Sequence, residues 1–95
     1  MSVNRSELLG LKNLGIASVN IINAVGIHTR EELAHFGAVE VYCRIVARDI
    51  NVSKVMLYAL HGALVDRHWS ELSTEVKDRL VREAQAALAT DSLVS

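Results

Sequence analysis

Apolar residues in this chain recur every three or four positions, and no stretch alternates apolar with polar residues for long. A spacing of three and four places side chains on one face of an α-helix, whereas a half-buried strand needs a period of two. The run Val39-Glu40-Val41 alternates, but the four-residue spacing around it persists for longer. The sequence therefore predicts an all-α protein, with no strand between Ala38 and Val65.

Glycines and polar breaks divide the chain into short segments. Gly15, Gly26 and Gly37 are eleven residues apart, and polar breaks follow near Asn51 and Ser70. Glycine ends a helix readily because it adopts the left-handed conformation without strain. We expect a compact array of five to six short helices joined by tight turns. The predicted helices cover residues 5–11, 17–25, 29–37, 38–48, 53–65 and 74–89.

Several of these segments follow a residue that can cap a helix N-terminus. In the run Thr29-Arg30-Glu31-Glu32, the Thr29 hydroxyl can accept from the Glu32 amide while the Glu32 side chain reaches back, which is the pattern of a capping box. A side-chain oxygen at such a position accepts one of the amides that the first helical turn leaves unpaired. The other predicted N-caps are Asn4, Ser53 and Ser73.

The interior must be built from aliphatic side chains, because aromatic residues make up only 4% of the sequence. The segment 53–65 carries so many apolar residues that we expect it to be the central helix. A glycine in a helix interior costs about 1 kcal/mol relative to alanine. Gly62 within this segment therefore suggests that another helix crosses closely at that point.

Length and composition set the broad class. A chain of 95 residues fits one domain, 1–95, with an ordered core over about 5–89. The net charge of −1 lacks the basic excess typical of nucleic-acid binding, and the single Cys43 suits a reducing cytosol. No stretch approaches the ~18 apolar residues of a membrane span, and residues 1–10 lack the pattern of a secretory signal. We expect a cytoplasmic protein without a membrane segment.

Three stretches occur in a recognisable order. They are Leu11-Lys12-Asn13-Leu14-Gly15 with Gly26-Ile27-His28-Thr29 eleven residues later, then Phe36-Gly37-Ala38-Val39-Glu40-Val41-Tyr42, and finally Leu57-Tyr58-Ala59-Leu60-His61-Gly62-Ala63-Leu64-Val65 with Arg67-His68-Trp69. In that order they resemble the C-terminal domain of the TfoX/Sxy family of competence regulators. The resemblance covers about Ser6 to Leu80, and its third stretch is the most specific.

The resemblance implies a non-enzymatic regulatory role. TfoX/Sxy proteins promote natural competence together with the cyclic-AMP receptor protein, and in many members this domain follows an N-terminal α/β domain. This sequence does not contain that domain, so the chain is expected to be either a stand-alone version or a fragment, and the initial Met1 favours the stand-alone version. We expect a protein-binding module of bacterial transcriptional or competence regulation that binds a protein partner or self-associates.

The alternative is a helix-hairpin-helix domain that binds DNA without sequence preference. Such a hairpin presents amides at a helix N-terminus to a phosphate oxygen. The residues for this phosphate site would be Lys12, Asn13, Gly15, Ala17 and Ser18. Ala17 stands where such hairpins often carry a glycine or a basic residue, and Lys12 is the only lysine or arginine between Glu7 and Thr29. The competing interpretation is that this turn has only a structural role, positioning the helices on either side of it.

Two other groups are candidates for binding a partner. Arg67 and Trp69 lie in a polar connection, and both residue types are enriched in binding hot spots. The competing interpretation makes Trp69 a lid over the core, with its indole N–H bonded to a main-chain carbonyl. Arg44 and Arg48 are four residues apart and would form a positive strip, with Arg44 paired to Glu40. The competing interpretation is that Arg44 and Arg48 simply lie on a solvent-exposed helix face, which would have the same sequence pattern.

No pattern in the chain predicts a metal, a cofactor or a small-molecule substrate. His61 and His68 are seven residues apart, as are His28 and His35, whereas zinc sites usually use closer pairs. Cys43 lies beside an apolar helix face, which favours a buried and inert thiol. No nucleophile, base and orienting group occur together, so we expect no enzyme.

Overall fold

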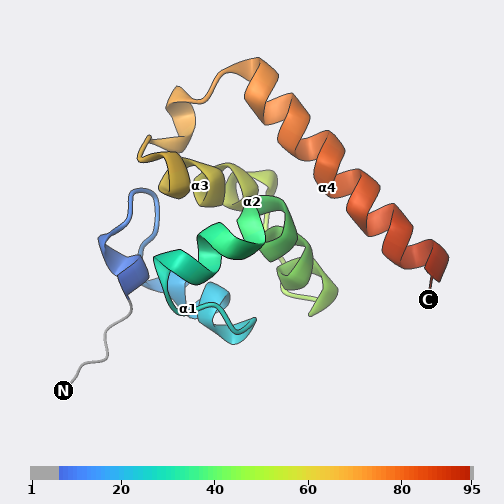
Figure 1. Cartoon of the computed structure of the whole chain (residues 1–95), viewed down its shortest axis with the longest axis horizontal. Helices are drawn as coiled ribbons and strands as arrows, with labels where there is room; N and C mark the ends of the chain where they lie inside the picture. The colour runs from blue at the N-terminus through green and yellow to red at the C-terminus, as the bar shows by residue number, and fades with distance from the viewer. Residues whose placement is uncertain (1–6, 95) are drawn as a thin grey trace.

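The computed structural model describes residues 7–94, and the side chains of residues 7–89. Within that range it contains four α-helices, two short 3-10 turns and no strand, so the all-α prediction is confirmed. The elements in chain order are η1 (Glu7–Gly10), α1 (Ile16–Ala24), α2 (Arg30–Ala47), α3 (Lys54–Val65), η2 (Trp69–Glu71) and α4 (Thr74–Val94). Figure 1 shows α1, α2 and α3 packed together, with α4 running along one side and its C-terminal end projecting beyond them.

The predicted count of five to six helices is not confirmed. The first segment forms a single 3-10 turn rather than a helix over 5–11, and its predicted cap Asn4 lies outside the described residues. The predicted third and fourth helices join in α2, which is broken at Gly37, where φ is 84° and ψ is 159°. Since a 3-10 turn and a loop precede α1, the structure does not bear out the predicted helix-hairpin-helix element.

The capping predictions on described residues are confirmed. Thr29 Oγ1 accepts a 3.0 Å hydrogen bond from the Glu32 amide, and Glu32 Oε1 accepts from the Thr29 amide at 3.3 Å. Ser53 Oγ accepts from the Val55 amide and Ser73 Oγ from the Val76 amide, each at 3.2 Å. Each of these oxygens satisfies an amide that has no partner inside its helix, which fixes where the helix begins.

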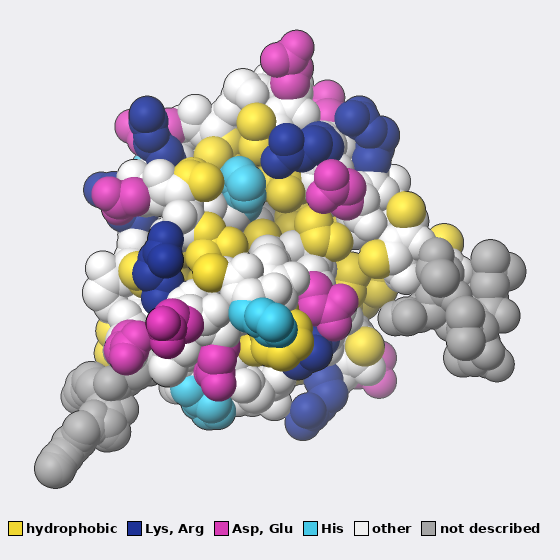
Figure 2. All heavy atoms as spheres, viewed as in Figure 1, with side chains coloured by type: hydrophobic (Ala, Val, Ile, Leu, Met, Phe, Trp, Pro, Cys, Tyr) yellow, Lys and Arg dark blue, Asp and Glu magenta, His cyan; other side chains and the backbone are white. Residues whose placement is uncertain are grey.

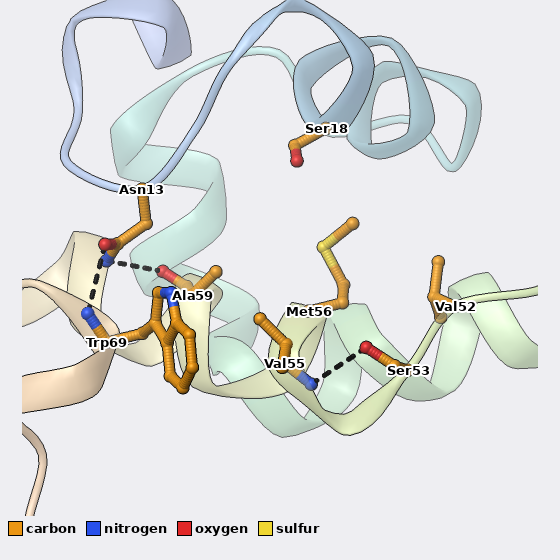
Figure 3. Close-up of a pocket in the computed structure, with 8 residues that line it drawn as sticks. All are labelled: Asn13, Ser18, Val52, Ser53, Val55, Met56, Ala59 and Trp69. Atoms are coloured by element: carbon orange, nitrogen blue, oxygen red, sulfur yellow. Dashed lines mark hydrogen bonds between the residues drawn. The ribbon is translucent and has the colours of Figure 1, made fainter.

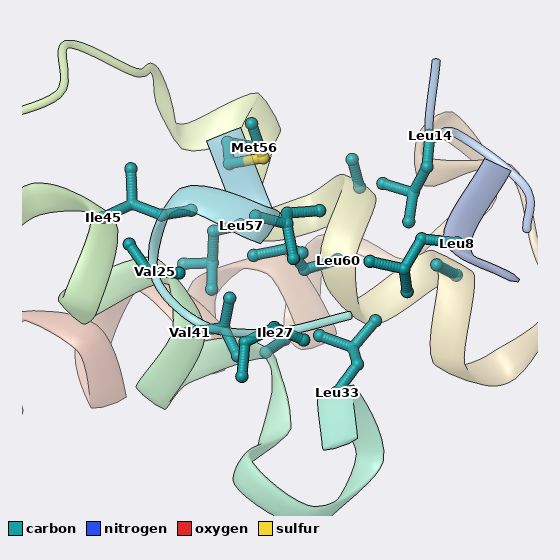
Figure 4. Close-up of a cluster of buried hydrophobic side chains, with 14 of the residues drawn as sticks. Leu8, Leu14, Val25, Ile27, Leu33, Val41, Ile45, Met56, Leu57 and Leu60 are labelled. Carbon is teal, nitrogen blue, oxygen red and sulfur yellow. The ribbon is translucent and has the colours of Figure 1, made fainter. Parts of the chain in front are cut away.

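The core is aliphatic, as composition predicted. Its fully buried side chains among the described residues are Leu8, Ile22, Ile27, Leu33, Ile45, Leu57, Leu60 and Val41. Figure 4 labels all of these except Ile22 and shows them converging from η1, α2, α3 and the loop that follows α1. Helix α3 packs against α2, η2 and α4, and α2 packs against α1, α3 and α4, so these two helices share the centre that the sequence pattern assigned to residues 53–65 alone. Burial of this aliphatic surface is the main term that holds the short helices together.

Helix α4 covers one side of α2 and α3 with its apolar stripe. Leu80 and Ala84 are buried, and Val76, Val81 and Leu88 pack against the core while remaining partly exposed. On its wet side Arg79 pairs with Glu83 at 3.7 Å. No helix among the described residues combines the length and apolar character that crossing a bilayer requires.

Candidate functional site

Asn13 ties three separate segments together at one corner of the molecule. Its Nδ2 donates to the Arg67 carbonyl at 2.9 Å and to the Ala59 carbonyl at 3.4 Å. Its Oδ1 accepts from the main-chain N–H of Trp69 at 3.0 Å. The turn before α1 is thereby joined to α3 and to the start of η2. Asn13 holds a positive φ of 73°, which asparagine tolerates better than most residues.

Gly62 makes room for this connection. A Cβ on Gly62 would lie 2.5 Å from Asn13 Nδ2 and 2.6 Å from the Arg67 carbonyl oxygen, both closer than real Cβ contacts. The sequence correctly indicated a close approach at Gly62, but the prediction of a crossing helix was wrong. The neighbours are a side chain from the first turn and the main chain that leaves α3.

An open groove lies beside this corner, and we call it the Trp69 groove. Its volume is about 240 Å³, and it is lined by Asn13, Ser18, Val52, Ser53, Val55, Met56, Ala59 and Trp69. Figure 3 shows Ser18 of α1 on one side and the α3 side chains on the other, with Met56 pointing toward α1. The buried floor is apolar, while Val55 remains 39% exposed at the edge. Such a groove fits apolar side chains better than a phosphate.

Trp69 is partly buried and belongs to a small aromatic cluster. Its ring stacks on Tyr58 at 6.3 Å and on His68 at 5.9 Å between centroids. The Lys77 ammonium lies 5.3 Å from the Trp69 centroid and 5.5 Å from that of Tyr58. The main-chain N–H of Trp69, not its indole, makes the recorded hydrogen bond within the described chain, so the predicted indole-to-carbonyl bond is absent there.

Arg44 and Arg48 line a second, separate concavity, which we call the Arg hollow. Its volume is about 300 Å³, and Val25 and Ala47 complete its lining. Arg44 Nε donates to Glu40 Oε2 at 3.0 Å, as the spacing predicted, and its guanidinium carbon lies 4.1 Å from the centroid of the Phe36 ring. The two arginines therefore share a face, but Arg67 and Trp69 lie elsewhere. Of the predicted partner-binding residues, Trp69 lines the groove, Arg44 and Arg48 line the hollow, and Arg67 lines neither.

The residues predicted for a phosphate site are spread over different environments. Lys12, Gly15 and Ala17 are exposed, Ser18 lines the Trp69 groove, and the Asn13 carboxamide is turned inward. Gly15 caps α1 without a side-chain hydrogen bond. The turn before α1 therefore serves to connect segments through Asn13. Lys12 is the one basic residue of the proposed phosphate site, and it lies on the exposed side of the turn.

Charges on the surface are mixed rather than segregated. On the face in Figure 2, basic and acidic side chains lie among one another, and hydrophobic side chains form a band where α4 meets the rest of the molecule. At this junction His61 of α3 has its pKa lowered by burial and, to a smaller extent, by Arg79, while Glu83 opposes the shift. On the face in Figure 2, the basic side chains therefore do not form a continuous positive track of the kind that follows a nucleic-acid backbone.

The described residues contain no cluster of three or more His, Cys, Asp or Glu that could hold a metal ion. Cys43 is buried, and its Sγ lies 3.8 Å from the Ala84 carbonyl oxygen, the geometry of a weak thiol donor. A nucleophilic thiolate needs exposure or a positive neighbour. Cys43 therefore packs as part of the core.

Sequence reasoning missed most of the groove. In the sequence pattern, nothing distinguished Val55, Met56 and Ala59 from other apolar residues of the predicted helix. No local pattern indicated that Tyr58 and Lys77 would contact Trp69. Gly62 was the one available signal, since a glycine in the middle of an apolar helix indicates a close neighbour.

One of the comparisons with known proteins identifies a family, and another finds solved structures of the same fold. The family model described as the TfoX C-terminal domain matches residues 4–84. A crystal structure of an uncharacterized protein from Listeria monocytogenes, in a triclinic form, is 32% identical with a TM-score of 0.76, covering 84% of this chain and 91% of that one. A tetragonal form of a Listeria monocytogenes protein of unknown function is 32% identical with a TM-score of 0.75, covering 82% and 96%. No curated protein matches.

Proposed function

Because the chain belongs to the TfoX C-terminal domain family, we propose that it is a regulatory module that binds another protein and has no catalytic activity of its own. The regulatory setting is bacterial transcription, of the kind that the natural-competence regulators of this family serve. The partner docks in the Trp69 groove. The module works in the cytoplasm, where its partner meets DNA.

The geometry of the Trp69 groove is the observation that carries this proposal. An open apolar trough with a partly buried tryptophan at its edge fits the pattern of interface anchors, in which Trp and Tyr are enriched. Asn13 bonds the main chain of both Ala59 and Trp69, which line the groove, and this bonding would reduce the free energy that a partner loses in ordering it. Burying one exposed aliphatic side chain completely stabilises a complex by up to about 2 kcal/mol.

A matched pair of substitutions tests the groove. Val55→Glu places a charge at the edge of the groove, where the valine is 39% exposed; Val65→Glu places one at the other end of α3, where the valine is 45% exposed. Because both valines are partly exposed, we expect both variants to fold. We expect Val55→Glu to weaken binding to the cyclic-AMP receptor protein about tenfold or more by calorimetry, and Val65→Glu to leave it unchanged.

Two further measurements distinguish other occupants. Sedimentation of the wild type and of Val55→Glu shows whether the groove holds a second copy of the chain, because only a groove-mediated dimer would dissociate in the variant. A duplex-DNA titration at ~50 mM salt tests the hairpin alternative. Tight DNA binding that is lost in Lys12→Gln, together with equal effects of the two valine substitutions, would replace the protein-binding proposal.

A further inference from the structure

The Arg hollow lies apart from the Trp69 groove and shares no lining residue with it. It forms where the last turns of α2 pass the end of α1, with Val25 at the C-cap of α1. Val25 is 8% exposed, so the hollow has an apolar floor beneath two arginines. An aliphatic side chain of moderate size fits a concavity of about 300 Å³.

Arg44 is already held in one orientation. Phe36 lies against one face of its guanidinium, and Glu40 accepts from Nε at 3.0 Å. No hydrogen bond joins its two terminal nitrogens to another residue of the described chain, and the side chain is 38% exposed. The terminal nitrogens of a fixed guanidinium form a planar fork that matches a carboxylate, and little conformational entropy is lost when it binds.

Arg48 supplies a second positive charge one turn further along α2. It is exposed, and within the described chain no ion pair neutralises it. Asp49 follows it with a φ of 61° but does not line the hollow. Glu40 already offsets the charge of Arg44, so Arg48 supplies the uncompensated positive charge of the hollow. The carbonyls at the end of α2 repel an anion with about half a charge, which the full charge of Arg48 outweighs.

We propose that the Arg hollow binds an acidic amphipathic segment of a protein partner. Carboxylates of the segment pair with Arg44 and Arg48, and an apolar side chain between them covers Val25 and Ala47. The apolar floor favours a peptide over a nucleic acid, because a phosphate backbone has no side chain to fill it. This binding is independent of the Trp69 groove.

A fluorescently labelled peptide that alternates glutamate pairs with leucine tests this proposal by anisotropy on the intact chain. We expect the peptide to bind, the affinity to fall as salt rises, and the same peptide with glutamine for glutamate to bind about tenfold more weakly or worse. Arg48→Gln should weaken binding about tenfold, and Arg48→Lys should restore part of it, because lysine keeps the charge but not the fork.

Arg82→Gln is the matched control, since Arg82 is an exposed arginine on α4 that lines neither surface. Circular dichroism of each variant confirms that it is folded. Equal loss in Arg82→Gln and Arg48→Gln would overturn the proposal, as would equal binding of the glutamate and glutamine peptides. Duplex DNA that binds in an Arg48-dependent way, while the acidic peptide does not, would assign the hollow to nucleic acid instead. Val55→Glu leaves peptide binding unchanged, so this result is separate from that of the groove.

Discussion

The Trp69 groove draws its walls from segments that are far apart in sequence, whereas the Arg hollow is carried largely by the last turns of α2. Asn13 reaches partners 46 to 56 positions away, and the groove has its shape only when these segments have met. Arg44 and Glu40 are four residues apart on one helix, so their geometry follows from the helix itself. One surface therefore depends on tertiary structure and the other on local structure, and substitutions should affect them differently.

The largest expected effect comes from filling the space at Gly62. Gly62→Ala forces both the Asn13 side chain and the Arg67 main chain to move, and should lower the free energy of unfolding by about 3 kcal/mol. Gly10→Ala is the control, because a Cβ there meets nothing within 4 Å. Urea denaturation of both variants measures the difference. Equal stabilities for the two would show that the corner is not tightly packed.

Removing the Asn13 carboxamide should have the next largest effect. Asn13→Gly keeps the positive φ accessible while removing all three hydrogen bonds, and we expect a loss of about 2 kcal/mol in the free energy of unfolding. Asn51→Gly changes an exposed loop asparagine and should have little effect. A double-mutant cycle of Asn13→Gly with Gly62→Ala should be non-additive, because the two residues are in contact. Strict additivity would disprove that coupling.

The Arg hollow should contribute much less to stability than the groove corner. Arg44→Ala removes an exposed ion pair and a cation–π contact, so the free energy of unfolding should fall by less than about 1 kcal/mol. The same denaturation experiment measures this change. If Arg44→Ala lowered the free energy of unfolding as much as Asn13→Gly does, the residues of the hollow would contribute as much to stability as the Asn13 corner.

The smallest effect concerns pH and lies at neither surface. Burial and Arg79 lower the folded-state pKa of His61, so the folded state binds the proton more weakly than the unfolded state. This contribution to stability is complete above the unfolded pKa of about 6.5 and is lost as pH falls through the folded pKa. Melting temperatures between neutral and mildly acidic pH should decline less in His61→Gln than in the wild type. Identical profiles would contradict the assigned cause.

The same contrast explains what could be read from the sequence. The capping residues Thr29 and Ser53 placed the starts of α2 and α3 to within a residue, because capping is decided over three or four neighbouring positions. The shared face of Arg44 and Arg48 followed from the helical period for the same reason. The Asn13 connection could not be foreseen, because no local rule selects which distant carbonyls a carboxamide will meet.

The first segment shows the opposite failure. A capped helix over 5–11 was plausible by local rules, yet the described part of it is one 3-10 turn that buries Leu8. Packing of Leu8 into the core decides the backbone there, since a helix of so few residues has little stability of its own. Tertiary contacts therefore override local preference where a segment is shortest.

The tight fit at Gly62 also has a consequence for how sequences of this kind can diverge. The Asn13 side chain and the Arg67 carbonyl both contact the position that a Cβ on Gly62 would occupy. During evolution, Gly62 could not be replaced until both the Asn13 side chain and the Arg67 main chain had moved. Asn13, by contrast, could be replaced first while Gly62 stayed in place. The order of these two substitutions is therefore restricted. Related sequences that keep Gly62 but have lost Asn13 should be far more common than sequences that keep Asn13 but have lost Gly62.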